Sequence, residues 1–353
     1  MSEAKPFEEW MQEQPPPDPE EIRRLKAEIA NLTKRIRGLR GGEEIIKAAV
    51  NEAYQEPPDL IIPKAPKSTG KGREETAILH LSDTQIGKVT ESYNSAVADE
   101  RIQLAVKKTA MIADLRRSQA KITTCKVYLG GDLVEGENIF PGQAHQIDQG
   151  VFDQAVMHGP AVFARAVNYL LGHFDKVEVW AVPGNHGRAA SKGVGSHPRT
   201  NWDNVAAHVL QTMFSGPIGA KSTAGRLSFH ITEYWHAVDN LYGFPLMMVH
   251  GDQIGGGFAG YPWYGVGRKA LAWGESVREW QGPRRYLLHG HFHQLTRWSL
   301  GQITILGNGT TESNNEFARS EIGFNSIPEQ RLAFFGPEQG LIADHALYLS
   351  ADA

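Results

Sequence analysis

The sequence predicts a layered α/β fold, because short apolar runs alternate with segments of helical pattern. The runs are four to six residues long and rich in Val, Ile, Leu or aromatic residues, as buried strands are. They lie at 77–81, 126–130, 177–182, 227–231, 245–249, 284–288 and 303–306. Between them, segments such as 98–118 and 151–172 have a helical pattern, and the first places Ile102, Val106 and Ala110 on one face.

Length and composition are those of an ordinary globular chain. Of 353 residues, 41% are hydrophobic and 22% charged, which excludes a largely disordered or collagen-like protein. One cysteine, Cys125, excludes a disulfide scaffold and a multi-cysteine zinc site, and it favours a reducing compartment. No apolar run approaches the roughly 20 residues that cross a bilayer, and the polar, acidic start is not a secretory signal. We therefore expect a cytoplasmic protein with no membrane partner.

The segments ahead of the α/β domain differ from it in pattern. Residues 1–17 are polar and proline-rich and predict a disordered tail, and 43–74, rich in Pro and Lys towards its end, predicts a linker. The domain itself is expected over 75–353. Between tail and linker, 18–42 predicts a helix with an a/d heptad stripe. The stripe consists of Ile22, Leu25, Ile29, Leu32, Ile36 and Leu39.

This helix has two interpretations. Ile at a and Leu at d favour a parallel two-stranded coiled coil, which would make the protein a homodimer through 18–42. A lone amphipathic helix is the alternative, because three heptads is short. Basic residues also cluster before residue 75, where they would either contact a phosphate backbone or form a solvated face.

Polar residues follow five of the predicted strands at their carboxyl ends. The sequences are LSDTQIG, LGGDLVEG, VPGNHGR, VHGD and HGHFH. They supply Asp83, Asp132, Asn185 with His186, His250, and His291 with His293. A single Asp or His in such a place is usually an ordinary loop residue. Five strand ends of this kind in series predict a common site, because ligands of α/β folds bind at the carboxyl ends of strands.

The residue types at this predicted site suit divalent metal ions. Asp, Asn and His without Cys favour Mn, Fe or Zn over a thiolate-seeking metal, and they are richer in nitrogen than Mg or Ca sites usually are. Two ions about 3.5–4 Å apart need a bridging carboxylate. Asp132 is the natural candidate for that bridge.

The motifs D-x-Q, GD-x-x-E, GNH, HGD and GH-x-H resemble those of the calcineurin-like metallophosphoesterase superfamily, over about residues 76–310. The resemblance implies a two-sheet β-sandwich flanked by helices, with a two-metal site at one edge. It implies one ion held by Asp83, Gln85, Asp132 and His293. It implies a second ion held by Asp132, Asn185, His250 and His291.

Two positions depart from the family pattern. Gln85 stands where the family usually has His, and an amide oxygen is a weaker, harder donor than imidazole, so the first ion is expected to bind loosely or to be Mn or Mg. Gly187 stands where an acid often orients the preceding histidine, so another group or solvent must fix the His186 ring. Glu135 is either that kind of partner or solvated. Arg188 is either a phosphate clamp or an ordinary surface arginine.

The resemblance implies hydrolysis of phosphate esters by direct attack of a metal-bridged hydroxide, with His186 donating a proton or stabilising the transition state. We expect a phosphodiesterase acting on nucleic acid, most simply a DNA nuclease similar to the double-strand-break-repair exonuclease branch, whose members work as dimers and prefer Mn. Residues 253–269 form either a flap whose Trp263 or Tyr264 stacks on a base or a glycine-rich loop with buried aromatics.

Two other functions stay open, because the formal charge of −4 gives no global basic field. One is a phosphomonoesterase acting on proteins or small molecules. The other is a non-catalytic assembly protein, in which Gln85 marks a decayed site. Residues 311–353 contain a strand-like segment at 345–349, and no chemistry is assigned to them.

Overall fold

The structure is a computed structural model. It describes residues 20–21, 23–24, 26–28, 62–67, 69–140, 142–189, 197–215, 223, 225–255, 260–313 and 327–350. The chain divides into two compact units, Met1–Gln55 and Glu56–Ala353. In the first unit the described residues are helical and exposed. The tail 1–17 and the whole heptad stripe lie outside the described residues, so the coiled coil and the homodimer stay predictions.

The end of the predicted linker lies on the second unit. The carbonyl oxygen of Pro63 accepts a hydrogen bond from Arg226 Nη1 at 2.9 Å, and that of Thr69 accepts one from the backbone N–H of Ile122 at 2.7 Å. The first strand then begins at Arg73. The described residues just before residue 75 are therefore held by the folded unit.

The first sheet has six strands, in the order β11-β10-β1-β2-β3-β4. Its strands are β1 (Arg73–Leu81), β2 (Ala120–Leu129), β3 (Lys176–Ala181), β4 (Leu227–Ile231), β10 (Glu329–Gly336) and β11 (Gly340–Tyr348). The first four are parallel, and β10 pairs antiparallel with both β1 and β11. The carboxyl ends of β1, β2 and β3 therefore meet at one edge of the sheet.

The second sheet has five strands, in the order β5-β6-β7-β9-β8. Its strands are β5 (His236–Leu241), β6 (Phe244–Val249), β7 (Arg285–His289), β8 (Thr296–Leu300) and β9 (Ile303–Gly307). The central strands β6, β7 and β9 are parallel, whereas β5 and β8 are antiparallel edge strands. Three more strand ends are thus gathered at one edge.

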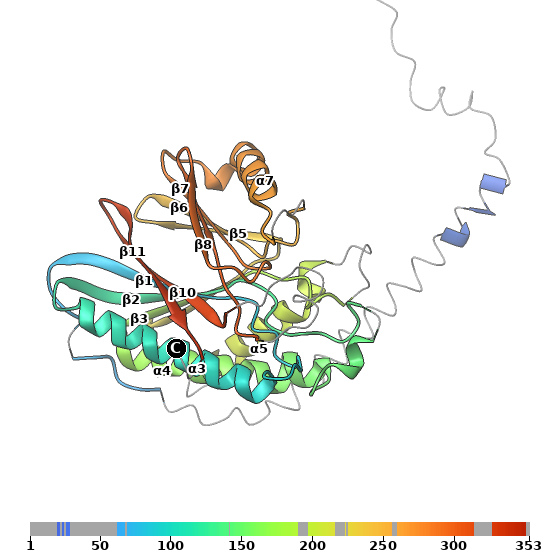
Figure 1. Cartoon of the computed structure of the whole chain (residues 1–353), viewed down its shortest axis with the longest axis horizontal. Coiled ribbons are helices and arrows are strands. Elements are labelled where there is room, and N and C mark those ends of the chain that lie inside the picture. The colour runs from blue at the N-terminus through green and yellow to red at the C-terminus, as the bar shows by residue number, and fades with distance from the viewer. Residues whose placement is uncertain are drawn as a thin grey trace, which may run out of the picture. The chain divides into compact units, whose positions relative to one another are not determined.

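Helices cover the outer faces of both sheets, as Figure 1 shows. Helices α3, α4 and α5 lie along the first sheet, and α7 lies on the second. Their bounds are α3 (Ser95–Arg116), α4 (Gly159–His173), α5 (Trp202–Ser215) and α7 (Trp263–Ser276). Short helical turns are η1 (Gln143–His145), η2 (Asp153–His158), η3 (Pro198–Thr200) and η4 (Arg278–Trp280). The predicted fold class, an α/β two-sheet sandwich flanked by helices, is confirmed.

Strand β6 illustrates how the sandwich is filled. Its residues alternate between two apolar clusters, because successive side chains of a strand point to opposite faces. Leu246 and Met248 pack towards the first sheet, and Met247 and Val249 pack towards α7. Since both faces are buried, the strand is apolar along its length, which is why the continuous run at 245–249 was visible in the sequence.

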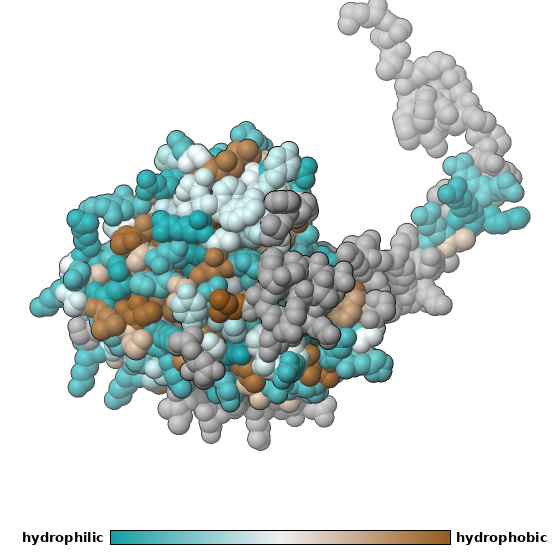
Figure 2. Space-filling model, viewed as in Figure 1, coloured by the Kyte–Doolittle hydropathy of each residue, from teal (hydrophilic) through white to brown (hydrophobic). Residues whose placement is uncertain are grey.

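The surface of the described part mixes polar and apolar residues, as the face drawn in Figure 2 shows. Among the described helices, none combines the length and the apolar character needed to cross a membrane.

Candidate metal centre

Five strand ends deliver the predicted ligands to one edge of the sandwich. Asp83 follows β1, Asp132 follows β2 and Asn185 follows β3. His250 follows β6, and His291 and His293 follow β7. We call Asp132, Asn185, His250 and His291 the Asp132 group, and Asp83, Gln85 and His293 the Asp83 group. The backbone N–H of His291 donates to both carboxylate oxygens of Asp83, at 3.0 and 3.1 Å, so the two groups adjoin.

The Asp132 group converges on the buried ring of His250. His250 Nε2 lies 3.0 Å from Asp132 Oδ2, 3.2 Å from Asn185 Oδ1 and 3.3 Å from His291 Nδ1. The other ring nitrogen lies 3.0 Å from the carbonyl oxygen of Gly130, to which it donates. That bond fixes the ring so that Nε2 faces the other ligands. Ligand atoms of Asp132, His250 and His291 all lie within 4.8 Å of one another, a spacing that suits a shared cation.

The ionisable side chains of this group shift one another's pKa strongly. Burial by itself opposes ionisation of Asp132, but the imidazoles of His250 and His186 hold its pKa well below the ordinary value. Burial and the neighbouring His250 lower the pKa of His291 to about 3. A metal ion requires an ionised carboxylate and neutral imidazoles. His291 is in that state. Burial opposes protonation of His250, whereas Asp132 raises the pKa of His250 to about 10, so an ion would have to displace the His250 proton.

The Asp83 group has a different set of neighbours. Asp83 Oδ1 lies 3.2 Å from His293 Nε2, and His293 Nδ1 lies 2.7 Å from Glu312 Oε1. Burial opposes ionisation of Asp83, yet His293 brings its pKa below the ordinary value. The side-chain oxygen of Gln85 accepts a hydrogen bond from Lys88 Nζ at 3.0 Å. Neither Lys88 nor Glu312 was predicted from the sequence.

Backbone strain is concentrated at the predicted ligands. Among the described residues, six non-glycine residues have a positive φ, and five of them are predicted ligands. Those five are Asp83 (54°), Gln85 (39°), Asp132 (49°), His291 (69°) and His293 (53°). This conformation costs on the order of 1–3 kcal/mol per residue and persists where a site requires it. Gln85 shares the strain, so its backbone is shaped like that of the other ligands.

His186 lies beside the Asp132 group and is oriented by Glu135. Its Nδ1 lies 3.1 Å from Glu135 Oε2, and its Nε2 lies 3.9 Å from Asp132 Oδ2. Glu135 is buried and is held in turn by Gln143 Nε2 at 2.9 Å. Burial opposes protonation of the ring, but the carboxylates of Glu135 and Asp132 raise the pKa of His186 to about 9. Glu135 thus orients the His186 ring, which Gly187 cannot do.

Position 187 has no room for an acid. A Cβ atom on Gly187 would lie 2.3 Å from Asn201 Oδ1 and 2.9 Å from the backbone nitrogen of Asp203. Asp203, which the sequence analysis missed, lies in the first turn of α5 and is buried. Its carboxylate accepts from the backbone N–H of Asp132 at 2.9 Å and of Gly184 at 2.7 Å, so it ties the second and third motifs together. Burial and the nearby Asp132 raise its pKa to about 6.

Arg188 forms an ion pair with Asp252, the acid of the VHGD motif. Gln253 Nε2 also donates to Asp252, at 2.6 Å. The Arg188 side chain is 27% exposed. The backbone N–H of Arg188 donates to the carbonyl oxygen of Asn185, a member of the Asp132 group. To bind phosphate with both terminal nitrogens of its guanidinium, Arg188 would have to break its ion pair with Asp252. Its role as a phosphate clamp stays a prediction.

Glu312, one of the residues not predicted from the sequence, obeys the strand-end rule that located the predicted ligands. Glu312 follows the carboxyl end of β9 by five residues, in the sequence GNGTTE, and is buried at the centre. Lys88 follows Gln85 by three residues. Applying the strand-end rule to 303–306 would have pointed to Glu312, in a segment to which no chemistry was assigned. Asp203 lies at a helix start and gave no such signal.

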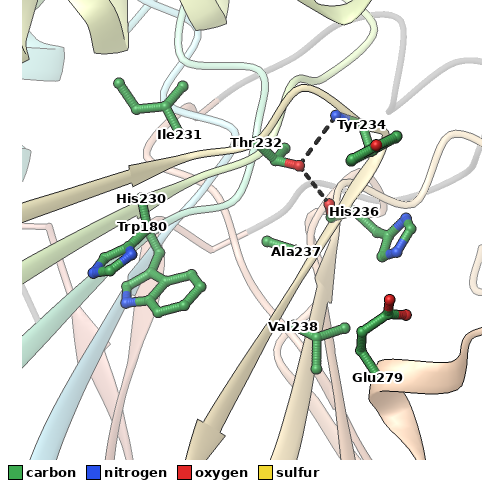
Figure 3. Close-up of a pocket in the computed structure, with 9 residues that line it drawn as sticks. All are labelled: Trp180, His230, Ile231, Thr232, Tyr234, His236, Ala237, Val238 and Glu279. Carbon is green, nitrogen blue, oxygen red and sulfur yellow. Dashed lines mark hydrogen bonds between the residues drawn. The ribbon is translucent and has the colours of Figure 1, made fainter.

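A separate cavity of about 560 Å³ lies where β4 faces β5. Figure 3 shows its lining, in which the rings of Trp180 and His230 stack with centroids 4.1 Å apart. Tyr234, His236 and Glu279 lie on its other side. None of the residues around it is a predicted ligand, so this cavity is distinct from the metal centre.

No family model matches the sequence, and no curated protein is similar to it. Among solved structures, the chain is similar to the phosphoesterase Yfce from E. coli at 13% identity and a TM-score of 0.34, over 77% of this chain and 99% of that one. It is similar to an archaeal phosphodiesterase at 9% identity and a TM-score of 0.36, over 76% and 99%. It is similar to a zinc complex of Vps29 from Entamoeba histolytica at 14% identity and a TM-score of 0.33, over 78% and 99%. None is close enough to assign this chain to a family, so its function has to be argued from the site.

Proposed function

We propose that this protein is a metal-dependent hydrolase of phosphate esters. The observation that carries the proposal is the convergence of seven donor side chains from five strand ends, five of them on strained backbone. A structural ion-pair network needs no such strain. Imidazole, carboxylate and amide donors without a thiolate suit a first-row divalent cation.

The two groups would hold two divalent ions, with Asp132 able to serve both. Mn fits this set of donors well, and Fe, Zn and Mg are the alternatives. When bound, such ions acidify a water molecule for in-line attack and offset charge on the phosphate oxygens. The carboxylate of Asp132 is fixed in place, because its Oδ2 faces His250 and its Oδ1 accepts from the backbone N–H of His186 at 2.7 Å.

His186 supplies the proton for the leaving group. Glu135 holds its Nδ1, which leaves Nε2 facing the Asp132 side of the centre. Its pKa of about 9 keeps the ring protonated at neutral pH. None of the seven predicted ligands is a serine, threonine or cysteine, so direct attack by water is the simplest scheme.

For the substrate we propose a phosphodiester of nucleic acid, with DNA as the first choice, as in a nuclease of the exonuclease type. Trp263 and Tyr264 begin α7, are 48% and 81% exposed, and offer surfaces on which bases stack. A series of aromatic contacts joins Trp263 to the centre. It runs from Trp263 to Tyr261 (4.5 Å between centroids), to Phe292 (5.5 Å) and to His291 (4.9 Å).

The test is digestion of labelled DNA, RNA and a phosphopeptide in parallel by the full chain with Mn²⁺. His186→Ala serves as the inactive comparison. Release of nucleotides by the wild type alone supports a nuclease. Cleavage of p-nitrophenyl phosphate without any cut in nucleic acid contradicts it and leaves a phosphomonoesterase.

Two further measurements separate the remaining functions. A preference for bis-p-nitrophenyl phosphate over the mono ester favours the diesterase, and the reverse favours a monoesterase. A non-catalytic assembly protein predicts fewer than one transition-metal ion per chain even after loading with Mn²⁺. Sedimentation of the full chain tests the homodimer through 18–42.

A further inference from the structure

Lys88 brings a positive charge into the Asp83 group. The backbone N–H of Lys88 donates to the carbonyl oxygen of Gln85 at 3.0 Å, and this turn folds the lysine side chain back towards Gln85. Its Nζ lies 3.0 Å from Gln85 Oε1 and 2.5 Å from Glu312 Oε2. The side chain is only 14% exposed. The ammonium is therefore a fixed part of the site and not a solvated surface charge.

Glu312 connects this ammonium to the rest of the group. One of its oxygens contacts Lys88, and the other lies 2.7 Å from His293 Nδ1, whose Nε2 faces Asp83. The contacts thus run from Gln85 through Lys88, Glu312 and His293 to Asp83. Both Glu312 and Gln85 are 1% exposed, so water screens these charges poorly.

Lys88 touches the Asp83 side of the centre and not the Asp132 group, although its charge also acts on Asp132. Within the part of the chain that the structure describes, no hydrogen bond or ion pair joins a lysine or arginine to the side chains of this group. Arg188, whose backbone N–H donates to the carbonyl oxygen of Asn185, pairs its side chain with Asp252. A fixed ammonium, paired with Glu312, therefore touches only the Asp83 side of the centre.

We propose that Lys88 makes the two metal positions unequal, so that the Asp132 group holds a resident ion and the Asp83 group an exchangeable one. This inference rests on the proposed function. A fixed ammonium repels a dication at short range, and the Gln85 oxygen that should bind the ion already accepts a hydrogen bond. Replacement of imidazole by an amide weakens the same position further. The activity of the protein then follows the concentration of free divalent ion.

The experiment measures ion binding without substrate. The full chain is stripped with chelator and titrated with Mn²⁺ by calorimetry, and the ions retained after dialysis are counted by elemental analysis. The wild type should retain one ion per chain and bind a second at least about ten-fold more weakly. Lys88→Met should tighten the second ion by about ten-fold or more, and the spin-coupled signal of a Mn pair should appear at lower Mn²⁺ concentration.

Charge and shape are separated by matched variants. Lys88→Arg keeps the charge, so the second ion should still bind weakly. Lys88→Gln removes the charge and should also tighten binding of the second ion, which keeps the test available if Lys88→Met does not fold. Lys107→Met, on an exposed lysine of α3, should change neither ion.

Each other outcome has a definite meaning. Two equally tight ions in the wild type overturn this inference and leave the proposed function intact. Weaker binding of the second ion in both Lys88→Met and Lys88→Gln also overturns this inference. Lys88 would then position Gln85 for the metal ion and not oppose binding of that ion. Fewer than one ion per chain after loading overturns the proposed function, and the inference with it.

Discussion

The Asp132 group and the Asp83 group adjoin at one edge of the sandwich, yet they balance charge in different ways. In the first, the buried carboxylate of Asp132 faces the rings of His250 and His186 and accepts from the backbone N–H of His186. In the second, a lysine and a further carboxylate from beyond β9 are built in. The same arrangement of strand ends thus produces two positions whose properties depend on neighbours outside the motifs.

The largest effect is expected from Asp132, which we propose serves both metal positions. Asp132→Asn should lower phosphoesterase activity by about 10³-fold or more, because the carboxylate charge offsets two dications at once. Metal content should fall below one ion per chain, measured by elemental analysis. Asp153→Asn, on an exposed aspartate of η2, is the matched control. Retention of two tight ions would show that the two positions do not share this ligand.

His186 should matter for the chemical step and not for ion binding. His186→Ala should lower kcat by about 10²–10⁴-fold, as loss of a general acid does, with both ions retained. His145→Ala, on an exposed histidine of η1, should have no effect.

The pH dependence follows from the same residue. The acid form of His186 is lost as the pH rises through its pKa of about 9, so the wild-type rate should fall on the alkaline side. Glu135→Gln removes the nearest negative charge, which lowers that pKa and should move the alkaline limb to lower pH. An unchanged limb in the profile of kcat against pH would rule out His186 as the titrating acid.

A substitution of Asp203 measures how far the Asp132 group depends on the hydrogen bonds that the Asp203 carboxylate accepts. Asp203→Asn should reduce the free energy of unfolding by on the order of 1–3 kcal/mol, because backbone donors of Asp132 and Gly184 lose a charged acceptor. Activity should fall by about 10–100-fold, as for other groups that hold a metal ligand in place. Urea unfolding and rate measurements check both. A loss confined to the second, exchangeable ion would contradict the assignment of Asp203 to the Asp132 group.

The smallest effect is expected at Gln85. Gln85→His restores the imidazole of the family pattern, and it should tighten the second ion by less than about ten-fold, because Lys88 remains in place. Calorimetric titration with Mn²⁺ measures the change. A gain larger than that from Lys88→Met would make the amide, and not the ammonium, the main cause of the weak position.

Most of the central strands were predictable because each is buried on both faces. The run at 245–249 is apolar throughout, since Met247 and Met248 lie on opposite sides and both meet apolar neighbours. The edge strands β5 and β8 were not predicted. Their residues are largely half-exposed or exposed, so HAVDNL and TRWSL carry polar side chains that hide the strand pattern.

The sequence alone determined which residues reach the centre from the strand ends, because a strand, its terminal glycine turn and the polar residue that follows are neighbours along the chain. Tertiary structure decided what surrounds them. Glu312 meets His293 because β9 lies beside β7 in the second sheet, and it meets Lys88 because the segment after β9 bonds to the segment after β1, from Thr311 to Asp83. Asp203 meets Asp132 because α5 begins near the end of β2. Such contacts join segments far apart in the chain, and no local pattern records how two sheets and their helices stack.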